Sequence, residues 1–190
     1  MIDPTAVVST MSRPELRLQM HAGQPIDIAT LGDTAWFGIS LGLPGWVERL
    51  SWKTFCKCFR REPSTGRVFG WNVRLRQDGV GAPPVPLYRE GRAITFGHFE
   101  VVPQVPRGPA SDISRGLLLD YGKGDNGWWD PIGLLRDPLV ALQPEAGAPL
   151  LGWSWVAIGP GIGTPSYFLL SRIGPLVQVD WEMTPMKQPA

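Results

Sequence analysis

The chain has 190 residues, of which 43% are hydrophobic and 18% charged, and its formal net charge is +1. It contains 23 glycines, 20 prolines and nine tryptophans, a composition that excludes a coiled coil, an all-helical bundle and a disordered tail for binding nucleic acids. The length suits one hydrophobic core, so we expect a single domain over residues 1–190, with residues 1–30 as a helical lead-in.

The two cysteines and the longest uncharged stretch bear on the protein's environment. Cys56 and Cys58 are two residues apart, which on a strand separates their side chains by about 7 Å, too far for a disulfide. With no secretion signal visible at the N-terminus, we expect a reduced, cytoplasmic protein. The uncharged run 146–171 is interrupted by Pro149, Pro160 and Pro165, so we expect strands there rather than a membrane helix.

The first half of the chain predicts one helix followed by strands. Ser12 and Glu15 have the spacing of a capping box, which indicates a helix over 12–22. β-forming residues predict strands at 34–41, 52–60 and 67–76, with a turn at 62–66 that makes the last two a hairpin. In the third strand, Phe69, Trp71, Val73 and Leu75 alternate with polar side chains. A proline-rich loop at 79–89 separates this hairpin from a strand at 93–102.

The second half predicts further short strands. We expect a strand at 116–121, a glycine-rich loop at 122–129 and a short helix over 130–136, with Asp130 as its N-cap and Pro131 in its first turn. More strands are expected at 139–142, 150–158, 164–171 and 176–181. Turns are expected at 143–149, 159–163 and 174–175.

Roughly eight to ten short strands indicate an all-β, mainly antiparallel protein, either a sandwich or a closed barrel. Lys57 alternates with cysteines and lies between Phe55 and Phe59 on one face of its strand. A packed sandwich core tolerates such a polar side chain poorly, whereas a barrel that encloses a ligand can use it. We therefore expect a single β-barrel.

Short segments carry a resemblance to a known group of barrels. Residues 32–38 (GDTAWFG) resemble the Gly/Trp-bearing first strand of lipocalin-like (calycin-type) proteins. The segments WKTF at 52–55, LLDY at 118–121 and LLGW at 150–153 are similar to uncharacterised bacterial proteins with the same barrel. The resemblance implies a lipocalin-like barrel that binds a ligand, and by analogy with calycin-like cyclases it also implies an enzyme as an alternative.

Three residues are candidates for acid–base chemistry: His98, Asp120 and Tyr121. His98 alternates with Ile94 and Phe96, so it is either a catalytic group lining a cavity or a hydrogen-bonded core histidine. Glu100 is placed to orient His98 or to form a solvated pair with it. Adjacent strand residues point to opposite sides, so only one of Asp120 and Tyr121 can face the interior; the alternative role for Asp120 is to bond the backbone of the following loop.

Aromatic residues and one lysine form the expected ligand-binding set. Lys57 would bind a ligand carboxylate or act as a base or Schiff-base amine; alternatively, it lies with Lys53 on an outer face and reaches water. We expect no metal and no other cofactor, since two histidines and a Cys-x-Cys lack the spacing of a zinc site. The full predicted set is Trp36, Lys57, Phe59, Phe69, Trp71, Phe96, Trp153 and Tyr167.

The main functional hypothesis is a barrel that binds a small hydrophobic molecule. The alternative is a cyclase or isomerase of natural-product biosynthesis that uses the same cavity. A third hypothesis is single-stranded nucleic-acid binding by the hairpin 49–76, where eight Lys/Arg stand against one acidic residue and alternate with aromatics; the overall pI of about 7.8 argues against it. We expect no membrane partner, and the sequence leaves a homodimer open.

Overall fold

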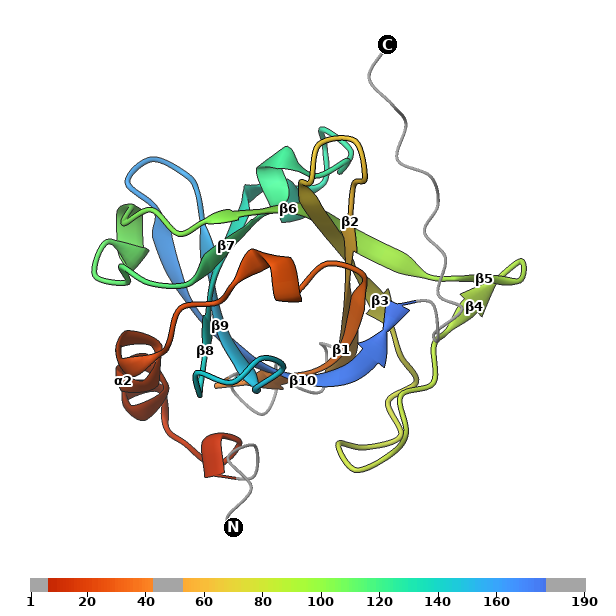
Figure 1. The fold of residues 1–190 in the computed structure, drawn as a ribbon, viewed down its shortest axis with the longest axis horizontal. Coiled ribbons are helices and arrows are strands. Elements are labelled where there is room, and N and C mark those ends of the chain that lie inside the picture. Colours follow the sequence, from red (N-terminus) through yellow and green to blue (C-terminus); the bar gives the residue numbers. More distant parts are fainter. Residues whose placement is uncertain (1–6, 43–52, 177–190) are drawn as a thin grey trace.

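An eight-stranded antiparallel barrel dominates the fold of the computed structural model, which describes residues 7–42 and 53–176. Each strand pairs with the next long strand along the chain, and the first pairs with the last, so the barrel is closed (Figure 1). This architecture fits a lipocalin-like fold in general. The barrel strands are β1 (Thr34–Leu41), β2 (Thr54–Arg61), β3 (Val68–Arg74), β6 (Thr95–Pro103), β7 (Leu117–Asp120), β8 (Leu135–Ala141), β9 (Leu150–Val156) and β10 (Ile162–Pro175).

The predicted order of elements is confirmed over most of the described chain. Helix α2 (Arg13–Ala22) begins at the Ser12–Glu15 capping box, and β1 has the predicted bounds. Short 3₁₀ helices precede β1 (η1, Ile28–Thr30), precede and follow β7 (η2, Gly108–Ala110; η3, Tyr121–Lys123), and precede β8 (η4, Pro131–Leu134).

No helix within residues 7–42 and 53–176 has the length and apolar character needed to cross a membrane.

Three local predictions differ from the structure. The helix expected over 130–136 is the 3₁₀ turn η4, which Asp130 caps through the backbone N–H of Ile132, and β8 begins directly after it. The turn expected at 174–175 is wrong, because β10 continues through these residues while pairing with the start of β1. The strand expected over 176–181 lies outside the described residues except for its first residue. The loop 79–89 ends in a two-stranded ribbon, β4 (Tyr88–Arg89) and β5 (Arg92–Ala93).

Both surfaces of the barrel wall are apolar, because segments outside the barrel cover much of it. One buried cluster lies in the interior and includes Phe59, Phe99 and Leu139. A second joins α2 to β8, β9 and β10, and a third contains Cys56, Cys58, Trp71, Val73 and Leu75. Trp71 and Val73 of β3 therefore lie on its outer face, in this third cluster. The opposite face of β3, with Asn72, turns inward.

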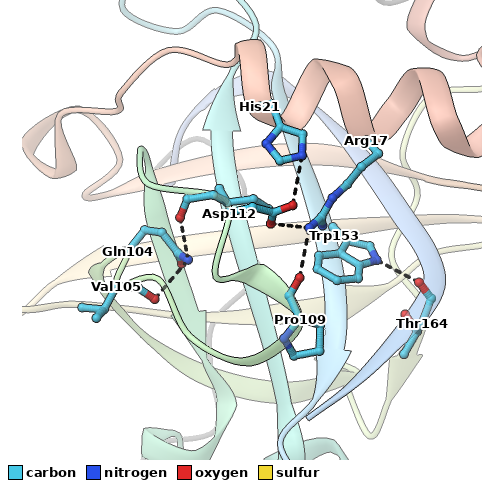
Figure 2. A network of polar contacts seen from close by, with 9 residues as sticks. Arg17, His21, Gln104, Val105, Pro109, Asp112, Trp153 and Thr164 are labelled. Atoms are coloured by element: carbon cyan, nitrogen blue, oxygen red, sulfur yellow. Dashed lines mark hydrogen bonds and ion pairs between the residues drawn. The ribbon is translucent and has the colours of Figure 1, made fainter. Parts of the chain in front are cut away.

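Polar contacts hold α2 and the segment after η2 against the wall (Figure 2). The Arg17 guanidinium forms an ion pair with Asp112, donates a hydrogen bond of 3.0 Å to the carbonyl of Pro109 and lies 4.4 Å from the Trp153 ring centroid. His21 Nε2 lies 3.2 Å from the other Asp112 oxygen. Asp112 thus connects the helix to the loop between β6 and β7.

Replacing Asp112 with asparagine should lower the free energy of unfolding at pH 7 by about 0.5 to 1 kcal/mol, because both charged side chains keep some exposure. Partial burial acts to raise the pKa of Asp112, but the hydrogen bond and charge of Arg17 hold it below its usual value. The stabilisation is therefore present above about pH 4 and is lost as the pH falls. Urea denaturation should show a wild-type advantage at pH 7 that narrows at pH 3; an equal advantage at both pH values would contradict this role.

Candidate functional site

A cavity of about 200 Å³ lies in one half of the barrel interior. Its lining residues come from the end of β1, the start of β2, the end of β3 and the matching ends of β6 to β10, so it lies at a single end of the barrel. The rim side chains Ser40, Phe96, Ile132, Leu135 and Ser166 are half-buried. The deeper lining residues are buried: Phe55, Lys57, Asn72, Tyr121, Asp137, Ser154 and Phe168.

Apolar side chains fill most of the other half of the interior. Fully buried Phe59, Phe99, Leu119, Leu139 and Leu170 fill it. The segment with η1 packs against this core through Ile26 and Ile28, and in Figure 1 it crosses the end of the barrel. A separate depression of about 240 Å³ at this end is lined partly by Trp36, Ala141 and Leu150.

Lys57 is the centre of a buried polar network at the floor of the cavity. Its Nζ donates hydrogen bonds to Asn72 Oδ1 at 2.8 Å and to Tyr121 Oη at 2.6 Å, and lies 3.8 Å from Asp137 Oδ2. Tyr121 Oη donates to the same carboxylate oxygen at 2.9 Å. These groups come from β2, β3, β8 and the 3₁₀ helix η3, which directly follows β7. Lys57 and Asn72 are directly paired across β2 and β3, so the wall holds the network from several sides.

One hydrogen-bond acceptor of this network, an oxygen atom of Asp137, has no partner of normal geometry among the described residues. Asp137 Oδ1 is buried and makes no hydrogen bond of normal geometry with the described residues, although the Ser154 hydroxyl is near enough to favour the charged carboxylate. A buried acceptor without a partner is costly. Asp137 Oδ1 can therefore accept a hydrogen bond from the Ser154 hydroxyl or from a donor that enters the cavity.

Three phenylalanine rings surround the ammonium group. Its Nζ lies 4.9 Å from the ring centroids of Phe99 and Phe168 and 5.5 Å from that of Phe55, distances at which an aromatic face attracts a cation. Each of the three rings lies over a glycine that is its direct partner on the neighbouring strand, and this close approach is possible only without a Cβ. The three pairs are Gly38–Phe55, Gly70–Phe99 and Gly152–Phe168.

Burial disfavours the charged forms of both Lys57 and Asp137. It lowers the pKa of Lys57 to about 8, although the charge of Asp137 opposes the shift. Burial also raises the pKa of Asp137, opposed by Lys57. The two pKa values therefore approach each other, and moving a proton from the ammonium to the carboxylate costs less here than in water.

Some of the residues predicted from sequence meet in the cavity. Lys57, Tyr121 and Phe96 line it, and Lys57 faces the interior rather than the outside. Phe59 faces the same interior but lies in the packed half, and Trp36 borders the depression at the far end.

The remaining predicted binding residues lie away from the cavity. Trp71 is packed in the outer cluster beside Cys56 and Cys58, whose thiols are free and buried. Trp153 and Tyr167 stack in the cluster under α2 with ring centroids 6.1 Å apart. Phe69 is half-buried beneath the Arg67 guanidinium, which lies 4.8 Å from its centroid. The cavity wall is thus built of phenylalanine, not tryptophan.

Two predicted acid–base residues have structural partners elsewhere. Gly97, with a φ of +56°, lies between Phe96 and His98, and the strand irregularity leaves Phe96 but not His98 among the lining residues. The His98 backbone exchanges hydrogen bonds with the Asn126 side chain, and burial lowers the pKa of its imidazole. Glu100 does not orient His98, because it binds Arg67 in a two-bond ion pair.

Asp120 has the alternative role considered from the sequence. Its Oδ1 accepts a hydrogen bond from the backbone N–H of Gly122 at 2.9 Å and lies 3.0 Å from the Arg136 Nε. It therefore supports the start of the glycine-rich loop, while its neighbour Tyr121 faces the cavity.

Sequence analysis missed Asp137, Asn72 and Ser154. Asp137 lay between a predicted helix and a predicted strand, so it was not assigned to a face. The alternation of Leu135, Asp137, Leu139 and Ala141 contains the signal, because all four share the inward face of β8. No cluster of three or more His, Cys, Asp or Glu side chains suited to a metal occurs in the described chain.

The aromatics proposed to stack on bases are mostly covered. In the described part of the hairpin 49–76, Trp71 and Phe59 are fully buried and Phe55 lies in the cavity wall. Trp52 lies outside the described residues. The positive charge of Arg67 is paired with Glu100.

Comparisons with known proteins add no assignment: no protein-family model matches the chain, and no curated protein matches it.

Proposed function

We propose that the protein binds a small, mostly apolar organic molecule in the barrel cavity. The observation that carries the proposal is the combination, in one cavity, of an aromatic wall with a buried polar floor that has an unused acceptor. Binding sites for small molecules typically join an apolar lining to a few placed polar groups, which fix the orientation of the ligand.

The size of the cavity limits the ligand. An apolar protein cavity of about 150 Å³ is known to hold benzene, and this cavity measures about 200 Å³. The enclosed part of the ligand is therefore close to one substituted six-membered ring, with any longer part directed toward the rim.

The polar residues at the floor of the cavity determine which polar head group a ligand can carry. Because Asp137 neutralises Lys57, the floor does not favour an anion by net charge. Asp137 Oδ1 can accept a hydrogen bond, whereas the three N–H groups of Lys57 are shared among Asn72, Tyr121 and Asp137. A head group that donates a hydrogen bond, such as an alcohol, matches this acceptor.

Calorimetric titration with toluene, benzyl alcohol and benzoic acid tests this proposal. We expect saturable binding of benzyl alcohol, at least tenfold tighter than that of toluene because a donor to Asp137 is worth about 1.5 kcal/mol or more. Benzoic acid should bind no more tightly than the alcohol at pH 7.

A pair of neighbouring substitutions provides the control. Leu135 lines the cavity, whereas Leu134 is exposed and lies on the outside of η4. Leu135→Trp should weaken benzyl alcohol binding at least tenfold by filling the cavity, and Leu134→Trp should leave it unchanged. The proposal fails if none of the three compounds binds below millimolar concentration, or if both variants bind like the wild type.

A further inference from the structure

We propose that Lys57 captures the carbonyl group of a bound aldehyde or ketone as a reversible Schiff base, with Asp137 as its counter-ion and Tyr121 as the proton donor between them. This inference rests on the proposed function, because it adds carbonyl compounds to the ligands that the same cavity would take. It rests on the placement of an amine, a carboxylate and a phenol at the closed floor of an apolar cavity.

The geometry suits an amine that reacts rather than one that only pairs. Lys57 is 2% exposed, yet it lines the cavity, so a ligand that enters the cavity can reach its amine. A ring the size of benzene packed against Phe55 and Phe168 would place its substituent near Nζ, which lies 5.5 Å and 4.9 Å from those ring centroids. Binding thereby fixes the carbonyl carbon near the nucleophile.

The surroundings of Lys57 also favour its neutral amine, the form that reacts with a carbonyl group. Only the deprotonated amine attacks a carbonyl, and desolvation is the usual way in which proteins obtain it. With the pKa of Lys57 lowered to about 8 by burial, roughly a tenth of the molecules hold a neutral amine at pH 7. Asp137, bonded to Tyr121, can receive the displaced proton.

The reaction balances without an oxidant or a reductant. The Nζ lone pair forms a C–N bond as the C=O π bond breaks, and Tyr121 protonates the new oxygen while Asp137 restores the phenol proton. The carbinolamine then loses its hydroxyl and an N–H proton as water, giving a C=N bond. The net change is amine plus carbonyl compound to imine plus water, and hydrolysis reverses it.

The product fits the site better than a neutral adduct would. A protonated imine keeps the positive charge where the ammonium was, so Asp137 remains paired and the Phe99 and Phe168 rings still face a cation. The unused Asp137 Oδ1 can accept the hydrogen bond of the carbinolamine hydroxyl during the reaction. The site thus stabilises both the intermediate and the product.

Benzaldehyde with sodium cyanoborohydride tests the proposal on the whole protein. The hydride reduces an imine to a stable secondary amine, so each capture adds one benzyl group, which intact-mass measurement and peptide mapping locate. Lys53 and Lys123 serve as internal controls, because Lys53 is half-buried and Lys123 is exposed. We expect Lys57 to be labelled at least tenfold faster than either lysine, and we expect benzyl alcohol to slow the labelling of Lys57 alone.

Two further measurements show whether the labelling of Lys57 depends on the folded cavity. Labelling in urea should remove the preference for Lys57, and Leu135→Trp should reduce labelling at Lys57 while leaving Lys53 and Lys123 unchanged. If benzyl alcohol binds but Lys57 is labelled no faster than the other two, the Schiff-base proposal is overturned and the binding proposal stands. If benzyl alcohol does not bind and Lys57 is not preferred, both proposals fail.

Discussion

Replacing Asp137 with alanine should lower the free energy of unfolding by about 3 to 5 kcal/mol, because it leaves the Lys57 ammonium buried without a counter-ion. Asp137 and Lys57 are each 2% exposed, so bulk water solvates the unpaired ammonium poorly. Tyr121 Oη would also lose the acceptor of its hydrogen bond. Chemical denaturation monitored by circular dichroism measures the loss.

The matched double variant separates the cost of an unpaired charge from the value of the pair. Lys57→Met with Asp137→Leu removes both charges and keeps similar volume, and such exchanges are often neutral or stabilising by about 1 to 4 kcal/mol. We therefore expect the double variant to be more stable than Asp137→Ala. A single variant that unfolds like the wild type would show that this carboxylate does not neutralise Lys57.

Gly70→Ala should lower the free energy of unfolding by about 1 to 3 kcal/mol, the loss typical of overpacking. A Cβ at this position would lie 2.4 Å from the Phe99 ring and 2.5 Å from the carbonyl oxygen of Cys58. The ring is fully buried and the carbonyl belongs to the paired strand β2, so neither can move freely. Thermal and urea denaturation should both report the loss.

Gly81→Ala is the control for this substitution, because a Cβ there meets no atom within 4 Å. It should leave stability unchanged or raise it slightly, since alanine restricts the unfolded chain. Equal effects of the two substitutions would mean that the contact between Gly70 and Phe99 carries no packing constraint.

The sequence predicts the elements better than it predicts their faces. The run 34–41 and the Ser12–Glu15 capping box depend on neighbouring residues, and both are confirmed. Which side of β3 faces inward depends on segments remote in sequence, because the outer cluster around Trp71 is as apolar as the interior. Alternation alone therefore could not decide whether Trp71 or Asn72 faces a cavity.

The candidate site was predicted only in part for the same reason. Lys57 was identified because it lies between two phenylalanines on one strand face, and Tyr121 because either it or its neighbour Asp120 had to face the interior. Asp137 was missed because η4 is a single 3₁₀ turn, and β8 begins earlier than the proline at 138 suggests. Glycines 38, 70 and 152 held a usable signal, since glycine within a strand often marks the close approach of another group.

Packed side chains, among them Phe59, Phe99 and Leu139, separate the cavity from the depression at the other end of the barrel, so the cavity opens at one end. Whatever occupies the cavity of about 200 Å³ has Lys57 and Asp137 at its far end and the rim residues Phe96 and Ile132 at its near end. A ligand would then enter and leave by the same route. Its head group would enter first and leave last. Ligands could thus differ widely in the length of the tail left at the rim, while the head group has almost no freedom to vary.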